Sequence, residues 1–330
     1  MDVLSRIRDK AAAKKSRVVL PEGTEPRIIR AAKKILSEGI ASVTLLGGEA
    51  EIETLAKEHG LNLSQVETIN PSHSGDYNDY VSEFMTIRRA KGITEEQAKS
   101  AMASPLYFGA MLVRHDKADA SVAGSINTTG DVLRAAIQVL GLKKRTRTVS
   151  SCFLMTIPEY RNAPDKAFLY ADCAVVPNPN AEQLASIAAS TAETVKKLLG
   201  EEPKIAMLSF STKGSAKHED VDKVLRALEI LRTDHPELKA DGELQVDAAI
   251  VPEVARQKAP GSEIAGDANV LIFPDLDAGN IAYKLTERLA NATATGPIIQ
   301  GLAKPANDLS RGCSVDDIVD VTAIAVLMKG

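Results

Sequence analysis

Residues 17–46 read RVVLPEGTEPRIIRAAKKILSEGIASVTLL, and this stretch decides the fold class. An apolar run at residues 17–20 leads through a Pro-Glu-Gly-Thr turn into a pattern of helical spacing over residues 25–38. Gly39 ends the predicted helix, and residues 42–46 are a second apolar run that is typical of a buried strand. A strand, a helix and a second strand in this order predict a parallel sheet with crossover helices.

The same alternation continues along the chain. Helical patterns separate most of the later apolar runs, so we expect an α/β protein with mainly parallel sheets. Further strands are predicted at residues 66–69, 118–123, 152–157, 167–170, 204–210, 244–246, 268–273 and 296–300. The helices predicted between them include residues 49–59, 132–140 and 248–258.

The composition is ordinary for a globular protein and argues against some partners. The 330 residues are 44% hydrophobic and 25% charged, which suffices for two domains. The net charge is −4 and the chain contains no Trp, so we expect no nucleic-acid partner. Cys152, Cys173 and Cys313 lie far apart, without the spacing of a zinc site or a disulfide framework, and no metal is expected.

The N-terminal segment does not have the pattern of a targeting signal. Residues 1–16 are charged throughout and lack an apolar core. No apolar run approaches the ~20 residues that a membrane helix needs. The sequence therefore predicts a cytoplasmic protein without membrane contact.

A second stretch, residues 301–319, reads GLAKPANDLSRGCSVDDIV. It follows a predicted strand, and its last residues begin a final helix predicted at residues 314–328. Several of its residues disfavour regular structure, namely Pro305, Asn307, Asp308 and Gly312. The resulting loop sets four polar side chains near a helix N-terminus beyond a strand end: Ser310, Arg311, Cys313 and Asp317. Open α/β sheets bind ligands at such places, and helix N-termini favour anions.

Asp317 has two interpretations. Ser314 followed three residues later by Asp317 fits a variant capping box, in which each side chain bonds the other residue's backbone N–H. Spacing alone favours this structural role over a catalytic one.

Two other loops between strands and helices are rich in hydroxyls and glycine. Residues 124–131 precede a helix that Thr128 or Thr129 could cap, with Arg134 about one turn inside it. Residues 211–215, STKGS, resemble a phosphate-binding loop but lack the Gly-x-x-x-x-Gly-Lys-Ser/Thr pattern. No Gly-x-Gly-x-x-Gly fingerprint for a dinucleotide occurs either.

Three long stretches, residues 204–221 (KIAMLSFSTKGSAKHEDV), 266–284 (GDANVLIFPDLDAGNIAYK) and 296–317 (GPIIQGLAKPANDLSRGCSVDD), resemble the phosphate acetyltransferase family. Shorter matches are Pro-Glu-Gly at residues 21–23, YFGAMLV at 107–113 and DVLR at 131–134. The resemblance covers essentially the whole chain, and the three long stretches together are highly specific.

The resemblance implies a fold of two α/β/α domains like that of isocitrate and isopropylmalate dehydrogenases, with the active-site cleft between them. It assigns residues 1–147 and 296–330 to the first domain and residues 148–295 to the second. It also implies a homodimer.

The activity implied is reversible transfer of acetyl between coenzyme A and inorganic phosphate. Acetyl-CoA plus phosphate gives CoA plus acetyl phosphate, by direct attack of the CoA thiolate in a ternary complex. Coenzyme A is a substrate here, and neither a metal nor a nicotinamide cofactor is expected.

Matched position by position, the resemblance assigns catalysis to Ser310 and Arg311 and makes Asp317 the base. With the resemblance added, the base is favoured over the cap at Asp317. Substrate-binding roles fall on five further residues, Arg88, Thr129, Arg134, Tyr283 and Lys284. Arg89 adjoins Arg88 and is the alternative at that position.

Other classes differ in what they would require. A thiol near a helix N-terminus can be nucleophilic, so Cys313 could form an acetyl-enzyme, although the family transfers the group directly. A related butyryl-transferring enzyme differs in its acyl pocket, and a non-catalytic acyl-CoA-sensing domain would not need the catalytic residues. A metal-dependent dehydrogenase of the same fold would need a carboxylate set that the sequence lacks.

Overall fold

The computed structural model describes residues 2–161 and 163–329 and divides into two compact units. The first unit contains Val3–Lys143 together with the chain from Leu302 onward, and the second contains Lys144–Gly301. The final segment of the chain therefore folds with the N-terminal part. Among the described residues, no helix is both long and apolar enough to cross a membrane.

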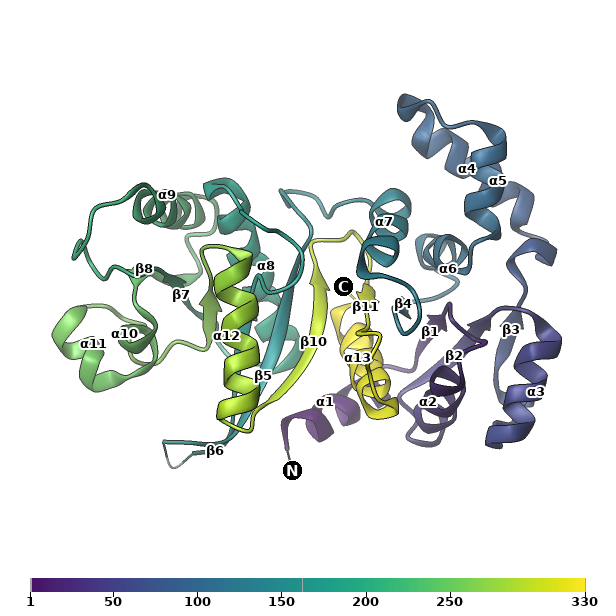
Figure 1. Ribbon diagram of the computed structural model, residues 1–330, viewed down its shortest axis with the longest axis horizontal. Coiled ribbons are helices and arrows are strands. Elements are labelled where there is room, and N and C mark those ends of the chain that lie inside the picture. Colours follow the sequence, from purple (N-terminus) through teal and green to yellow (C-terminus); the bar gives the residue numbers. More distant parts are fainter. Residues whose placement is uncertain (1, 162, 330) are drawn as a thin grey trace. The chain divides into compact units, whose positions relative to one another are not determined.

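The first unit is built on a five-stranded sheet with the order β11-β4-β1-β2-β3 (Figure 1). All of its neighbouring strands pair in parallel. The strands are β1 (Ser16–Leu20), β2 (Ala41–Leu46), β3 (Glu67–Ile69), β4 (Ala120–Ala123) and β11 (Ala306–Asp308). The predicted strand–helix–strand unit at residues 17–46 is confirmed, because β1 and β2 are parallel neighbours joined by α2 (Pro26–Ser37).

The helices of the first unit are buried either along one face, as in α2, or over nearly their whole surface, as in α13. The apolar side of α2 includes the buried Ile28, Ile29 and Ile35. Every residue of α13 from Ile318 to Leu327 is buried, as expected of a helix that is apolar nearly all round. Besides α2, the α-helices of this unit are α1 (Val3–Ala12), α3 (Glu49–His59), α4 (Tyr77–Arg88), α5 (Glu95–Ala103), α6 (Pro105–Arg114), α7 (Thr129–Leu140) and α13 (Val315–Met328).

The second unit has a six-stranded mixed sheet with the order β10-β5-β6-β9-β7-β8. Strand β5 pairs antiparallel with both β10 and β6, and the remaining pairs are parallel. The strands are β5 (Ser150–Tyr160), β6 (Ala163–Ala171), β7 (Lys204–Leu208), β8 (Lys239–Leu244), β9 (Val270–Ile272) and β10 (Thr293–Gln300). The helices are α8 (Ala181–Leu198), α9 (Glu219–Asp234), α10 (Val246–Ile250), α11 (Pro252–Lys258) and α12 (Leu276–Leu289).

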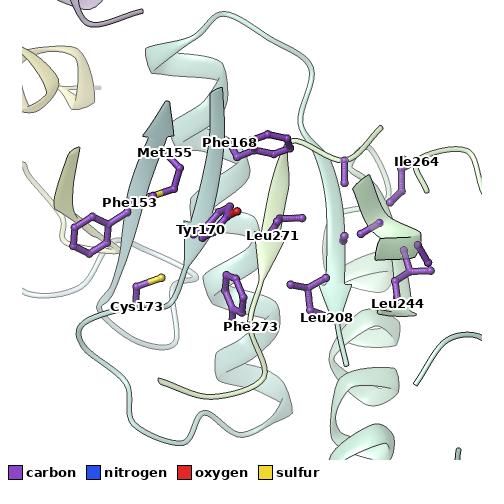
Figure 2. Packing of buried hydrophobic residues seen from close by; sticks show 14 of the residues in the cluster. Phe153, Met155, Phe168, Tyr170, Cys173, Leu208, Leu244, Ile264, Leu271 and Phe273 are labelled. Atoms are coloured by element: carbon purple, nitrogen blue, oxygen red, sulfur yellow. The ribbon is translucent and has the colours of Figure 1, made fainter. Parts of the chain in front are cut away.

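One hydrophobic cluster of the second unit joins β5, β6 and β9 (Figure 2). Within it the rings of Tyr170 and Phe273 lie 5.3 Å apart. Helix α12 packs so closely on the end of β6 that a Cβ atom added at Gly279 would lie 2.1 Å from the Asp172 carbonyl oxygen. This contact fixes the helix that carries Tyr283 and Lys284. The predicted α/β class with mainly parallel sheets is confirmed for the chain as a whole.

Several sequence-based boundaries were wrong. The strand expected at residues 244–246 is β8 at Lys239–Leu244, and Val246 already begins α10. Residues 306–308 form β11 beside β4, although the local residue types disfavour a strand. Residues 296–300 were expected in the first domain, whereas they belong to β10 and pair with β5 in the second unit. The helix expected at residues 248–258 is divided at Val251, because Pro252 begins a new helix there.

Candidate active site

The carboxyl ends of β1, β4 and β11 lie next to one another in the first sheet, since these strands are parallel neighbours. Each strand leads into a loop with polar side chains: residues 21–25, 124–128 and 309–314. The second and third loops open α7 and α13. Two helix N-termini therefore start from adjacent strand ends, where ligands bind in open α/β sheets.

The buried carboxylate of Glu22 fixes the loop after β4. Only 3% of Glu22 is exposed. Its Oε2 accepts hydrogen bonds from the Gly124 amide at 3.0 Å and from the Ser125 amide and hydroxyl at 2.7 and 2.5 Å. Its Oε1 accepts from the Ile126 amide at 3.1 Å and from the Asn127 amide and side chain at 3.0 and 2.8 Å. Burial by itself raises the pKa of Glu22, but these donors outweigh it and hold the pKa below the ordinary value.

Arg27, the second residue of α2, joins the same loop to the loop after β11. Its Nη2 donates to the Ser125 carbonyl oxygen at 2.9 Å, and its Nη1 donates to the carbonyl oxygens of Arg311 and Cys313 at 2.8 and 3.0 Å. Its Nε bonds Glu25 at 2.6 Å. The planar guanidinium thus holds two loops at once, which a single ammonium group could not do.

Glu22 and Arg27 were missed by sequence reasoning as site residues. The only signal was the short Pro-Glu-Gly match at residues 21–23. Their partners lie about one hundred or more residues away along the chain, so no local pattern reveals them.

Ser310 and Arg311 lie exposed at the start of the loop that leads into α13. The Ser310 Oγ accepts a hydrogen bond from the Gly312 amide at 3.3 Å. No residue in the described ranges, 2–161 and 163–329, accepts a hydrogen bond from the Arg311 guanidinium. The Arg311 backbone is held by Arg27, while its side chain is free to bind an oxyanion.

Asp317 forms both bonds of the predicted capping box. The Ser314 amide donates to Asp317 Oδ2 at 2.8 Å, and the Asp317 amide donates to Ser314 Oγ at 3.1 Å. The Asp317 side chain is nevertheless exposed. Capping and an additional chemical role are therefore both compatible with its position.

Thr128 and Thr129 have different roles at the start of α7. Thr128 is the cap, because its Oγ1 accepts from the Asp131 amide at 3.2 Å. The Thr129 hydroxyl donates instead to Asp308 Oδ2 at 2.6 Å. One turn further on, the exposed Arg134 pairs with Asp131 at 2.6 Å.

The positive charges of Arg88 and Arg134 both affect the pKa of the Tyr107 phenol. Burial raises the pKa of Tyr107, and the positive charges of Arg134 and Arg88 oppose that shift. Arg88 is partly buried at the end of α4, whereas Arg89 is exposed. These observations support Arg88 over Arg89 as the partner of Arg134, and substrate binding by both arginines stays a prediction.

Tyr283 and Lys284 lie on α12 in the second unit. The Tyr283 ring stacks on Phe153 with centroids 4.1 Å apart, and Lys284 Nζ lies 5.7 Å from the Tyr283 ring. Their predicted contribution to a phosphate pocket stays a prediction.

The STKGS loop of the second unit is not arranged as a phosphate cradle. Glu243 accepts hydrogen bonds from the Ser211 hydroxyl at 2.7 Å and from the Gly214 amide at 2.8 Å. Lys213 Nζ is paired with Asp241 at 2.5 Å. The groups that would bind phosphate in this loop are therefore already bound to carboxylates.

Across residues 2–161 and 163–329, no three His, Cys, Asp or Glu side chains gather in a way that could hold a metal ion.

A parallel α/β sheet whose adjacent strand ends carry hydroxyls, arginines and two helix N-termini defines a protein of the oxyanion-binding class. Within that class, the chain belongs to the phosphate acetyl/butaryl transferase family, whose model matches residues 2–326. The chain is 53% identical to a phosphate acetyltransferase of Thermoanaerobacterium thermosaccharolyticum, with 98% of each chain covered.

Solved structures agree with this family assignment. A phosphotransacetylase from Streptococcus pyogenes has a TM-score of 0.94 at 42% identity, with 99% of this chain and 98% of that chain covered. A Salmonella typhimurium protein described as a 4-hydroxythreonine-4-phosphate dehydrogenase has a TM-score of 0.57 at 11% identity, covering 95% of this chain and 99% of that chain. The second likeness concerns the fold alone.

We predict that Arg27→Lys weakens binding of inorganic phosphate about tenfold, because an ammonium group cannot hold both loops in place. The melting temperature should fall by only a few degrees, since each lost hydrogen bond is worth about 1 kcal/mol. Calorimetric titration with phosphate and a thermal melt give the two values. Arg30→Lys is the matched control, because Arg30 is exposed on the same helix and its Nε reaches only the Pro26 carbonyl at 3.4 Å. Equal affinities in the two variants would contradict the positioning role.

Proposed function

We propose that this protein transfers acetyl groups reversibly between coenzyme A and inorganic phosphate, so that acetyl-CoA plus phosphate gives CoA plus acetyl phosphate. The full-length likeness to phosphate acetyltransferases supports the reaction. The single observation that carries the proposal is the pair Ser310 and Arg311, exposed before α13 on a backbone held by Arg27.

Each member of the pair suits one part of the reaction. The planar guanidinium of Arg311 can bind two phosphoryl oxygens at once. The Ser310 hydroxyl can donate to the acetyl carbonyl oxygen while negative charge develops on it. The N-termini of α7 and α13 add two further sources of positive potential.

Asp317 is the proposed base that accepts the CoA thiol proton. An ordinary Asp has a pKa of about 3.9 and a thiol about 8.5, so complete transfer before attack would cost roughly 6 kcal/mol. Transfer that is concerted with attack avoids this cost. The exposed position of Asp317 at the start of α13 allows a thiol to approach it.

Cys313 is a poor nucleophile in this setting. It is buried, and burial raises the pKa of its thiol to about 11, although the nearby Arg27 opposes the shift. At pH 7 roughly one thiol in ten thousand would then be ionised. Direct attack of the CoA thiolate on acetyl phosphate in a ternary complex is therefore proposed, rather than an acetyl-cysteine intermediate.

Five residues, Arg88, Thr129, Arg134, Tyr283 and Lys284, are proposed to bind the anionic groups of the substrates. Coenzyme A enters as a substrate, and no metal or nicotinamide takes part. The family also includes butyryl transferases, so the preferred acyl chain is part of the test.

The direct experiment incubates chelator-treated protein with acetyl-CoA and inorganic phosphate and follows the release of free CoA thiol. We expect CoA release that depends on phosphate and needs neither metal nor nucleotide. Butyryl-CoA in the same assay measures chain preference, and we expect acetyl-CoA to turn over faster. No release from either thioester would leave the acyl-CoA-sensing alternative, and dependence on added Mg²⁺ and NAD would favour a dehydrogenase.

We predict that Asp317→Asn melts within a few degrees of the unchanged protein but loses at least about a hundredfold in turnover. Asn keeps an oxygen that can accept the Ser314 amide, so a pure cap would be largely preserved. Activity should recover in part at high pH, where CoA ionises without a base. Asp316→Asn is the control, because Asp316 lies beside Asp317 and pairs with Lys34. Normal turnover in Asp317→Asn would restrict Asp317 to capping.

We also propose a homodimer in which the exposed face of α12 contacts a second copy. Ile281, Leu285 and Leu289 recur every four residues on this helix and are 56%, 52% and 81% exposed. Aligned exposed apolar side chains of this kind mark contact surfaces. We predict that Leu285→Glu yields monomers by light scattering, whereas Leu225→Glu on α9, a single exposed leucine, does not. A dimer that survives Leu285→Glu would exclude this surface.

A cytoplasmic location is proposed from the cysteines. Cys152, Cys173 and Cys313 are all free and buried, which suits a reducing compartment. Recovery of the activity in the membrane or extracellular fraction of the source cells would contradict this location.

A further inference from the structure

Asp308 is a buried carboxyl group that the proposed reaction does not use. It is the last residue of β11, two positions before Ser310, and is 1% exposed. Its Oδ2 accepts a hydrogen bond from the Thr129 hydroxyl at 2.6 Å. Its Oδ1 has no hydrogen-bond partner in the part of the chain that the structure describes. An unpartnered buried oxygen is costly, and more so when it carries charge.

The backbone encloses this carboxyl group tightly. Gly124 has a φ of +123°, and a Cβ atom added there would lie 2.5 Å from Asp308 Oδ1 and 2.6 Å from the Leu309 amide nitrogen. The Leu309 amide donates to the Ala123 carbonyl at 2.8 Å. The lack of a side chain at Gly124 therefore lets the two loops close around this carboxyl group.

Glu22 is the charged group that acts on Asp308. Burial is the main cause that raises the pKa of Asp308, to about 6, and the negative charge of Glu22 adds to it. The hydrogen bond from Thr129 opposes the shift. Asp308 can therefore change its protonation state near neutral pH, while the hydrogen-bonded Glu22 stays ionised.

Charged groups on the helices packed against β11 are already engaged elsewhere. On α7, Asp131 and Arg134 pair with each other at 2.6 Å and point into solvent. On α13, Asp317 is exposed and accepts the Ser314 amide, while Asp316 and Asp320 pair with Lys34 and Arg8. Arg27 reaches this region only through backbone carbonyl oxygens and Glu25.

The direction of the Thr129 hydroxyl follows from the state of Asp308. The hydroxyl has one proton to donate. When Asp308 is ionised, it accepts the hydrogen bond from that hydroxyl, and Thr129 presents only lone pairs to an anion bound before α7. When Asp308 is protonated, its own O–H can donate to Thr129 Oγ1, and Thr129 can then donate to the anion.

We propose that Asp308 is a positioning residue that turns the Thr129 hydroxyl toward a bound phosphoryl group by taking up a proton when that group binds. The proton comes from solvent and returns to it when the phosphoryl group leaves. The inference rests on the proposed function, because it requires the phosphate or acetyl phosphate to bind beside Thr129. No covalent bond of Asp308 with substrate is involved.

The test measures proton uptake on anion binding. Sulfate is the probe, because it stays a dianion near neutral pH and contributes no proton of its own. Calorimetric titrations at pH 7 in buffers of different ionisation enthalpy give the number of protons bound per sulfate. We expect wild-type protein to take up most of one proton, and Asp308→Asn to take up none while binding sulfate within about tenfold of wild type. The amide of Asn can replace the carboxylic O–H as donor to Thr129.

Two further variants keep the test decisive. Asp316→Asn removes an exposed carboxylate at the start of α13 and should leave the proton uptake unchanged. Thr129→Val should reduce sulfate affinity and the uptake together, with a thermal melt showing that the protein is folded. Equal uptake in wild type and Asp308→Asn, or sulfate binding by wild type without uptake or not at all, would overturn the inference. Failure of the acetyl-transfer assay in wild type would instead overturn the proposed function.

Discussion

The structure of the first unit depends on one buried carboxylate. Glu22 accepts six hydrogen bonds from residues 124–127, four of them from backbone amides. An unpaired carboxylate at this depth would be strongly destabilising, so the loop after β4 must close on it. Because the pKa of Glu22 is lowered by folding, its contribution to stability is present above the ordinary glutamate pKa and is lost as pH falls through the lowered value.

From this constraint the rest of the site follows. The closed loop presents its Ser125 carbonyl to Arg27, and Arg27 in turn holds the backbone of Arg311 and Cys313. The Glu22 carboxylate is buried and the Arg27 side chain is half-buried, whereas the Arg311 side chain is left exposed. The charged groups that organise the loops are thus distinct from the side chain proposed to meet phosphate, which allows a rigid backbone to support an accessible cation.

The sequence predicted the repeated strand–helix pattern well, because apolar periodicity is a local property. It placed α3 at residues 49–59 and the end of α7 at Leu140. It failed at β11, since Asn307 and Asp308 have low strand propensity and the strand exists only through its pairing with β4. It could not find Glu22 or Arg27 as site residues, whose roles depend on partners far along the chain. The capping box at Asp317 was predicted and is formed, but its geometry alone does not separate cap from base.

In this structure the Glu22 carboxylate holds the loop on which the site is built. Amide hydrogen exchange of Gly124, Ser125, Ile126 and Asn127 tests it most directly, in wild type and in Glu22→Gln. Gln keeps one acceptor oxygen and cannot serve all six donors. We expect these amides to exchange at least about tenfold faster in Glu22→Gln, while amides within α8 of the second unit keep their rates. Unchanged protection of residues 124–127 in the variant would contradict it.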